Sequence, residues 1–272
     1  MASHRHRQAG AGGGQHGEPS LSRAFRGDRV RAVHSTRRGR GLRRGPQAAL
    51  SDGAGAFFRE LLPAFETSSG HRVAAQYGPA GAIAERIRKG EAVDVAVVTV
   101  AQSETLIREG KAAAASRVEI GKVGVGAYVA KGAARPDIAS ADAFTRALRA
   151  AKSIGHTDPA SGGASGIYLA SLFERLGLAA ELRPKIRLFP GGPSISPPSP
   201  RATSSYAFGQ ISEIVNRPNV EFVGPLPAEY QNYTRFAAFV AAGTGNGEAA
   251  ALVRHLAAPA AKAAMRAKGF EP

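Results

Sequence analysis

From Ser51 to the end of the chain, segments patterned as β-strands alternate with segments patterned as α-helices. Strand-like runs are short and rich in β-branched residues, whereas helix-like runs place their apolar residues on one face. This alternation predicts an α/β fold with a mainly parallel sheet flanked by helices. The expected strands are 72–77, 93–99, 123–130, 152–156, 185–189, 220–223 and 236–241, and the expected helices are 56–66, 82–90, 101–109, 141–151, 167–176, 248–256 and 260–268.

The turn between the strand 152–156 and the helix 167–176 has a composition that suits an anion. It reads Asp-Pro-Ala-Ser-Gly-Gly-Ala-Ser-Gly over residues 158–166, and its glycines let the backbone approach a ligand closely. The first turn of a helix leaves backbone N–H groups unpaired, and the helix dipole adds partial positive charge there. The stretch therefore predicts an anion site, to which Ser161 and Ser165 add hydroxyl groups. An ordinary helix start after a glycine-rich turn is the structural alternative.

Positive charge is concentrated at the N-terminal end of the chain. The 272 residues carry a net charge of +15, and residues 1–50 hold 11 arginines against 2 acidic residues. The remainder is only mildly basic, which weakens the case for a polyanionic partner of the whole protein. No cysteine is present, so disulfides and thiolate chemistry are excluded. No apolar run in the sequence has the length needed to cross a membrane.

Residues 1–50 show neither helical nor strand periodicity, and we expect a disordered basic tail there. No apolar h-region follows the basic residues, so no signal peptide is recognisable. The run 43–48 contains Gly45 and Pro46, which are poor residues for a central strand.

A second unusual segment, 193–206, is rich in proline and serine where a connecting helix is expected. We predict irregular structure over 193–206 and hypothesise that this segment and residues 1 to about 49 are translated from a shifted reading frame. A missing first strand and a missing connecting helix would each expose backbone groups and apolar surface. On this reading the chain is expected to be less stable than its relatives and to bind ligand poorly.

Candidate catalytic and metal-binding chemistry is sparse. The histidines and acidic residues do not have the spacing of a metal site, and the serine of the glycine-rich turn does not have that of a nucleophile elbow. Asp94 and Asp158 are interpreted as a strand-edge residue and a turn or cap residue. The sequence therefore predicts no catalytic residue, no metal ligand and no cofactor, and we expect a protein that is not an enzyme.

From about Ser51 to Pro272 the chain resembles the type II periplasmic solute-binding proteins, in particular their molybdate-binding branch. The order and intervals of five short stretches carry the resemblance. They are Leu61–Glu66 with Ser69–His71, Tyr77–Gly81, Asp94–Val97, Thr157–Gly163, and Gly209–Glu213 leading to Val223–Pro227.

The resemblance implies two α/β lobes, 51–121 plus 236–272 and 122–235, with a ligand bound between them. Pro79 and Ala80 stand where molybdate binders offer serine hydroxyls, which puts molybdate itself in doubt. Carried over by position, the ligand-binding residues are Ser51, Gly78, Pro79, Ala80, Gly81, Ser161, Gly162, Gly163, Ala164, Ser165 and Gln210.

The resemblance further implies capture of a small anion, a molybdate-like oxyanion or a small carboxylate, for an ABC-type uptake transporter. A monomer that works with a membrane permease is the expected assembly. The family is periplasmic, and a cytoplasmic location stays open because no signal is recognisable. Two alternatives of other classes remain: a ligand-sensing regulatory domain of the same fold, and nucleic-acid binding through the Arg-rich tail, which lacks interleaved aromatic residues.

Overall fold

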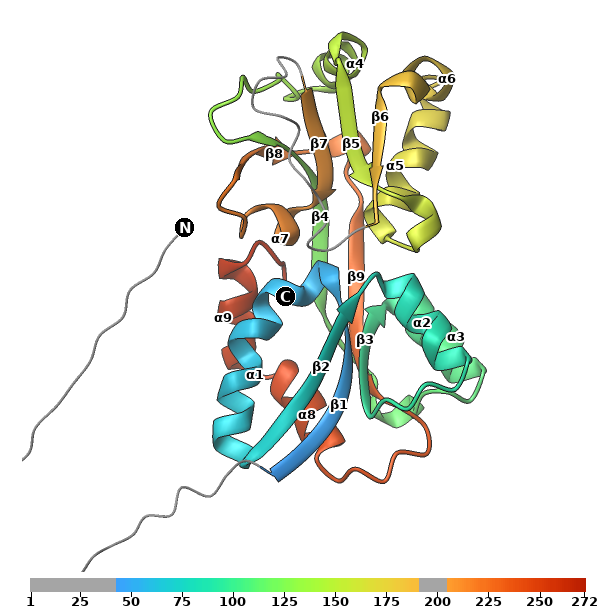
Figure 1. The fold of residues 1–272 in the computed structure, drawn as a ribbon, viewed down its shortest axis with the longest axis vertical. Coiled ribbons are helices and arrows are strands. Elements are labelled where there is room, and N and C mark those ends of the chain that lie inside the picture. Colours follow the sequence, from blue (N-terminus) through green and yellow to red (C-terminus); the bar gives the residue numbers. More distant parts are fainter. Residues whose placement is uncertain (1–42, 191–204) are drawn as a thin grey trace, which may run out of the picture. The chain divides into compact units, whose positions relative to one another are not determined.

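The computed structural model describes residues 43–190 and 205–272, and the predictions for 1–42 and 191–204 lie outside them. Nine strands of this part of the chain form a mixed sheet in the order β2-β1-β3-β9-β4-β7-β5-β6, with β8 paired to β4 (Figure 1). The strands are β1 Arg43–Ser51, β2 His71–Gly78, β3 Val95–Thr99, β4 Val118–Ala130, β5 Ser153–Thr157, β6 Ile186–Phe189, β7 Ser205–Gln210, β8 Val220–Pro225 and β9 Tyr233–Val240. The helices are α1 Gly55–Ser69, α2 Ala80–Arg88, α3 Val100–Arg108, α4 Ala141–Ala150, α5 Ala164–Arg175, α6 Ala179–Leu182, α7 Ile211–Ile214, α8 Ala249–Leu256 and α9 Pro259–Ala267.

Two lobes, each with its own hydrophobic core, share this sheet. In lobe 1 the strands β2, β1 and β3 are parallel, with α1, α8 and α9 on one face and α2 and α3 on the other (Figure 1). In lobe 2 the strands β6, β5 and β7 are parallel and pack with α4 and α5 around a second core. The α/β two-lobed fold is therefore confirmed, with the parallel strands of each lobe joined by antiparallel neighbours.

The antiparallel strands β4 and β9 run through both lobes (Figure 1). Residues 118–124 of β4 pair with β9, whereas residues 125–130 pair with β7 and β8. The predicted lobe boundaries at 121/122 and 235/236 fall within these two strands. They stay predictions, because a strand shared by two lobes has no sharp boundary of its own.

The strand β1 corrects the expectation that residues 43–50 belong to a tail. It lies between β2 and β3, so it is central in lobe 1, and Ala48, Ala49 and Leu50 are buried. The register with β2 shifts between Arg44 and Gln47, which places the intervening glycine and proline at a bulge. A proline is tolerated at a bulge because no ladder hydrogen bond is required of it there.

The carboxylate of Asp94 secures the strand just after that bulge. It accepts the backbone N–H of Gln47 at 2.8 Å and also bonds to the hydroxyl of Thr244 and, at 3.3 Å, to the amide of Asn246. Asp94 is thus a structural residue that joins β1 to the loop after β9. The sheet has its first strand, so the expectation that this strand is missing is wrong. The lower stability expected of the chain and the shifted reading frame stay predictions.

The start of β7 corrects the far end of the segment predicted to be irregular. Ser205 and Tyr206 are buried strand residues that pair with Ser153 and Ile154 of β5. The tyrosine side chain reaches α4, where its hydroxyl donates to the carbonyl oxygen of Ala147. The prediction of irregular structure is therefore wrong for residues 205–206. The rest of the predicted segment, 193–204, lies outside the described residues.

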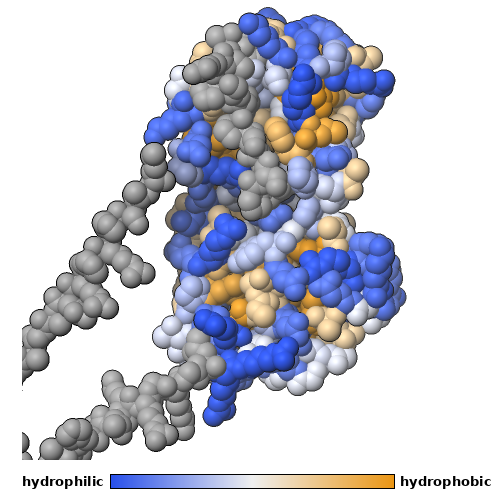
Figure 2. Space-filling model, in the orientation of Figure 1, coloured by the Kyte–Doolittle hydropathy of each residue, from blue (hydrophilic) through white to orange (hydrophobic). Residues whose placement is uncertain are grey.

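The apolar face predicted for the first helix is confirmed in α1. Its buried residues include Phe57, Phe58, Leu61, Leu62 and Phe65, and Pro63 lies inside the helix. Within the described ranges, no helix combines the length and the apolar character needed to cross a membrane. In the view of Figure 2, hydrophilic residues cover much of the described surface, with hydrophobic residues in several separate groups.

Candidate functional site

A narrow pocket lies where the two lobes meet, at the C-terminal ends of several strands and the N-termini of helices. Such positions are where ligands bind in open α/β sheets. We call it the central pocket. Its lining residues are Ser51, Asp52, Gly53, Pro79, Ala80, Thr157, Gly163, Ala164, Ser165, Gln210, Glu213 and Phe236.

The predicted anion turn forms the lobe 2 wall of this pocket. Asp158 begins the turn by accepting the N–H of Ala160 at 2.9 Å, as a cap residue does. Gly162 has φ of 77°, a left-handed conformation that favours glycine. The turn delivers Gly163 to the N-cap of α5, whose first residues, Ala164 and Ser165, line the pocket. The N-terminal N–H groups of α5 therefore lie at the wall where an anion is favoured.

Two of the predicted residues build the turn rather than line the pocket. The Ser161 hydroxyl donates to the carbonyl oxygen of Asp158 at 2.7 Å, so it is used inside the turn. Gly162 faces lobe 1, where its carbonyl oxygen accepts the N–H of Gly81 at 3.2 Å. Neither residue is among those lining the pocket, and both hold Gly163 in place.

The Gly81–Gly162 contact joins the two lobes directly. A Cβ atom on Gly81 would lie 2.8 Å from the Cα of Gly162, so the backbones touch without side chains between them. Pro79 caps α2 and, with Ala80, lines the pocket, whereas Gly78 ends β2 opposite Ser51 and is not among the lining residues. The second predicted loop thus supplies pocket lining and a contact between the lobes.

Four buried polar side chains converge on the pocket: Ser51, Thr157, Ser165 and Gln210, each 3% or 4% exposed. Within the described part of the chain, the hydroxyls of Ser51, Thr157 and Ser165 have no hydrogen-bond partner, and none of their oxygen atoms is fully enclosed. The three hydroxyls are therefore open to the pocket and available to a ligand. Sequence reasoning missed Thr157, although its place as the last residue of β5, directly before the turn, is a signal for it.

The opposite wall, which we call the carboxyl wall, is built by the 3-10 turn Asp52–Ala54 of lobe 1 against α7, which lies in the range of lobe 2. The Ser212 hydroxyl donates to the carbonyl oxygen of Gly53, which ties this turn to α7. A Cβ atom on Gly53 would lie 1.7 Å from the side-chain oxygen of Gln210, so only glycine fits beneath that amide. Asp52 and Glu213 flank this attachment; the resemblance placed Asp52 in the first binding loop, 51–53, whereas Glu213 was not predicted as a site residue.

The carboxyl groups of Asp52 and Glu213 both have raised pKa values. Burial raises the pKa of Asp52, and the positive charges of Arg59 and Arg217 oppose that rise. Burial, and then the charge of Asp52, raises the pKa of Glu213 to about 7, against the effect of Arg217 and a backbone hydrogen bond at Gln210. A carboxylic acid with such a pKa exchanges its proton near neutral pH.

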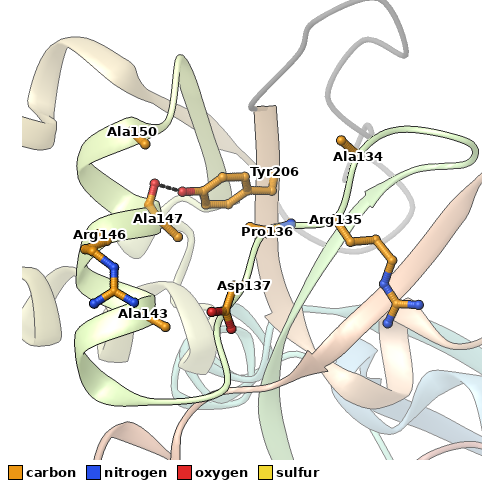
Figure 3. Close-up of a pocket in the computed structure, with 9 residues that line it drawn as sticks. All are labelled: Ala134, Arg135, Pro136, Asp137, Ala143, Arg146, Ala147, Ala150 and Tyr206. Carbon is orange, nitrogen blue, oxygen red and sulfur yellow. Dashed lines mark hydrogen bonds between the residues drawn. The ribbon is translucent and has the colours of Figure 1, made fainter.

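A second pocket lies within lobe 2, between α4 and the loop after β4 (Figure 3). The Tyr206 ring spans it toward Ala147, and Arg135 points away from it. It contains none of the predicted site residues and, unlike the central pocket, no helix N-terminus with free hydroxyls. Among residues 43–190 and 205–272, no group of three or more histidine or acidic side chains could hold a metal ion.

Several solved structures with the same fold are named as binding proteins for inorganic anions. The periplasmic molybdate-binding protein of Azotobacter vinelandii matches with a TM-score of 0.66 and 18% identity, over 83% of this chain and 98% of that chain. The sulfate-binding protein of Mycobacterium tuberculosis matches with a TM-score of 0.63 and 17% identity, over 84% of this chain and 87% of that chain. At these identities the matches show the fold alone.

Sequence relatives identify the family. Over 221 residues the chain is 31% identical to an aconitate isomerase of a Pseudomonas species, a match that covers 79% of this chain and 82% of the relative. The sequence pattern of a family described as bacterial extracellular solute-binding protein matches residues 47–271, which include the second half of β1 and every residue that lines the central pocket. The chain therefore belongs to the bacterial extracellular solute-binding protein family.

Proposed function

We propose that the protein captures a small polycarboxylate anion in the central pocket and delivers it to an ABC-type uptake transporter. The observation that carries the proposal is the convergence of Ser51, Thr157 and Ser165 on the N-terminus of α5. Hydroxyls and free N–H groups replace the water around an anion, and the helix dipole favours its charge.

A carboxylate is better supported than a tetrahedral oxyanion. The relative at 31% identity is named for aconitate, which carries several carboxylates, whereas the oxyanion-binding structures are 18% identical or less. Pro79 and Ala80 line the pocket without offering a hydroxyl. Several carboxylate groups on one ligand would instead use donors on both lobes.

Capture would proceed by closure of the two lobes, which we assign to 51–121 plus 236–272 and to 122–235, with residues 43–50 added to the first. The Gly81–Gly162 contact lies between these lobes and is compatible with a closed arrangement. We place the working protein outside the cytoplasmic membrane, as a monomer that docks on a permease.

A ligand screen tests the proposal. Thermal melting is measured with cis-aconitate, trans-aconitate, citrate, molybdate, tungstate and sulfate, because a ligand bound only by the folded state raises the melting temperature. The expected result is a rise with the carboxylates, confirmed by calorimetry, and its loss in the double variant T157V/S165A. Ser171→Ala, at an exposed serine of α5, serves as the matched control. A rise with molybdate or sulfate only would reassign the ligand class, and no rise at all would contradict the proposal.

Isomerisation of aconitate is the second candidate function. It is favoured by the name of the relative together with two carboxyl groups in the pocket, one of which exchanges its proton near neutral pH. Such a group suits proton transfer at a carbon next to a carboxylate. Conversion of cis- into trans-aconitate, followed by proton NMR with Glu213→Gln as the comparison, tests this activity. Binding without conversion would leave capture as the function.

A further inference from the structure

The two walls of the central pocket make opposite demands on charge. The lobe 2 wall carries the N-terminus of α5 and free hydroxyls, which favour an anion. The carboxyl wall carries Asp52 of lobe 1 and Glu213 of lobe 2, which repel an anion when both are ionised. A bound polycarboxylate would therefore meet like charge across a narrow space.

The position of the carboxyl pair is fixed by packing. Asp52 adjoins Gly53 and Glu213 adjoins Ser212, and the Ser212–Gly53 hydrogen bond holds these neighbours together. Gln210, packed against Gly53, holds the start of the same helix. The segments that carry the two carboxyl groups therefore cannot separate without breaking these contacts, which also shape the pocket.

An outer pocket adjoins the central one and shares the carboxyl pair with it. Asp52 and Glu213 line both spaces, while Arg59 from α1 and Arg217 after α7 line the outer one together with Asn216. The pair therefore stands between the ligand space and a polar space with two guanidinium groups. This arrangement gives a proton a polar approach to the inner carboxyl group.

The charged groups around Glu213 act in opposite directions. Asp52 and burial favour its protonated form, and Arg217 favours its ionised form. Tyr128, on β4, is buried with its hydroxyl unpartnered among the described residues, and burial raises its pKa so that it stays neutral. Arg59 acts on the partner carboxyl, Asp52. The balance leaves the pair able to hold one proton near neutral pH.

We propose that ligand capture in the central pocket is coupled to uptake of one proton by the Asp52–Glu213 pair. The inference rests on the proposed function, since it requires an anion in the pocket. An arriving carboxylate adds negative charge beside the pair, which favours the protonated form of Glu213. The protonated carboxyl group donates a hydrogen bond to a ligand oxygen, and no covalent bond changes.

Calorimetry measures this coupling directly. The protein is titrated with trans-aconitate at pH 8 in two buffers of different ionisation enthalpy. The change in the observed binding enthalpy, divided by the difference in buffer ionisation enthalpy, gives the number of protons taken up per ligand. We expect about one proton per ligand, and affinity that falls up to about tenfold per pH unit between pH 7 and 9. In that range the carboxylates of the probe stay ionised, so their titration adds nothing.

Two variants identify the group that takes the proton. Glu213→Gln should bind with no proton uptake and with affinity independent of pH, and Asp52→Asn should move the pH profile of wild-type binding to lower pH. Glu174→Gln, at an exposed carboxyl of α5, should behave as the wild type. Binding without proton uptake, or an unchanged pH profile in E213Q, overturns the inference and leaves capture intact. Absence of binding by every anion of the screen would instead contradict the proposed function itself.

Discussion

The two walls of the central pocket differ in how much of their chemistry can be predicted from the sequence. The lobe 2 wall comes from one continuous run, 157–165, whose glycines and serines indicate an anion site. The carboxyl wall combines the turn after β1 with the start of α7, more than 150 residues later. A local sequence pattern can predict a wall formed by one continuous segment. A wall formed by two distant segments can be recognised only when the folded structure shows which segments pack together.

The largest expected effect is on the lobe 2 wall. Gly163→Val should weaken aconitate binding by at least about 100-fold, roughly 3 kcal/mol, while the protein still folds. A Cβ atom at this position would lie 2.5 Å from the Thr157 side chain, so the substitution displaces a ligand-facing residue. Calorimetry gives the affinity and circular dichroism the melting temperature. Unchanged affinity would reduce the glycine to part of an ordinary turn.

At the carboxyl wall the expected effect is on stability instead. Burial raises the pKa of Glu213 to about 7, above its ordinary value in an unfolded chain. At pH 4 the group is protonated whether the chain is folded or not, so burying it costs no folding free energy. Above pH 7 the folded chain must bury a charged carboxylate, and the cost in folding free energy is largest. Wild-type stability should fall through this range by on the order of 2 kcal/mol on account of this group. Glu213→Gln should therefore melt higher than the wild type at pH 8 and equally at pH 4.5. Parallel melting curves at both pH values would show that the carboxyl is not buried as described.

A smaller effect separates hydroxyl donors from helix N–H groups on the lobe 2 wall. Thr157→Val keeps the shape of the buried side chain and removes its free hydroxyl, so binding should weaken about tenfold, near 1.4 kcal/mol. Stability should be nearly unchanged, because that hydroxyl has no partner among the described residues. Calorimetry beside Ser171→Ala checks this, and a loss of 100-fold would mean that the threonine also shapes the turn.

The smallest effect concerns the contact that joins the lobes. Gly81→Ala should weaken binding about fivefold, because its methyl group would press against the Gly162 backbone and hinder closure. Ala82→Gly, in the same helix α2 as Gly81, is the control. Gly90→Ala would not serve, because Gly90 has φ of 86° and an alanine there would be strained. Small-angle scattering with and without aconitate should show less compaction in G81A. Equal compaction would assign the contact no role in closure.

Much of the fold could be predicted from the sequence, because strand and helix patterns are local. The strand β1 could not, since the glycine and proline at 45 and 46 argue against a strand until a bulge takes them out of the ladder. That bulge is stabilised by Asp94, 47 residues from Gln47, and such a contact is invisible to a local pattern.

The candidate site divides in the same way. The glycine-rich turn, Ser51 and Gln210 were predicted at the pocket and lie there, although Ser161 and Gly162 support it from behind. The resemblance placed Asp52 in the first binding loop, but the sequence predicted no role for its carboxyl group or for that of Glu213. Their chemistry arises from burial and from each other, and neither property can be deduced before the chain is folded.

The central place of β1 sets a limit on how the chain can be shortened. A fragment that begins at Ser51 would lose the strand between β2 and β3 and leave a row of unpaired N–H and C=O groups on each. Exposed edges of this kind recruit strands from other molecules, and the result is aggregation rather than a smaller working protein. Expression of a compact, soluble fragment therefore has to begin no later than Arg43.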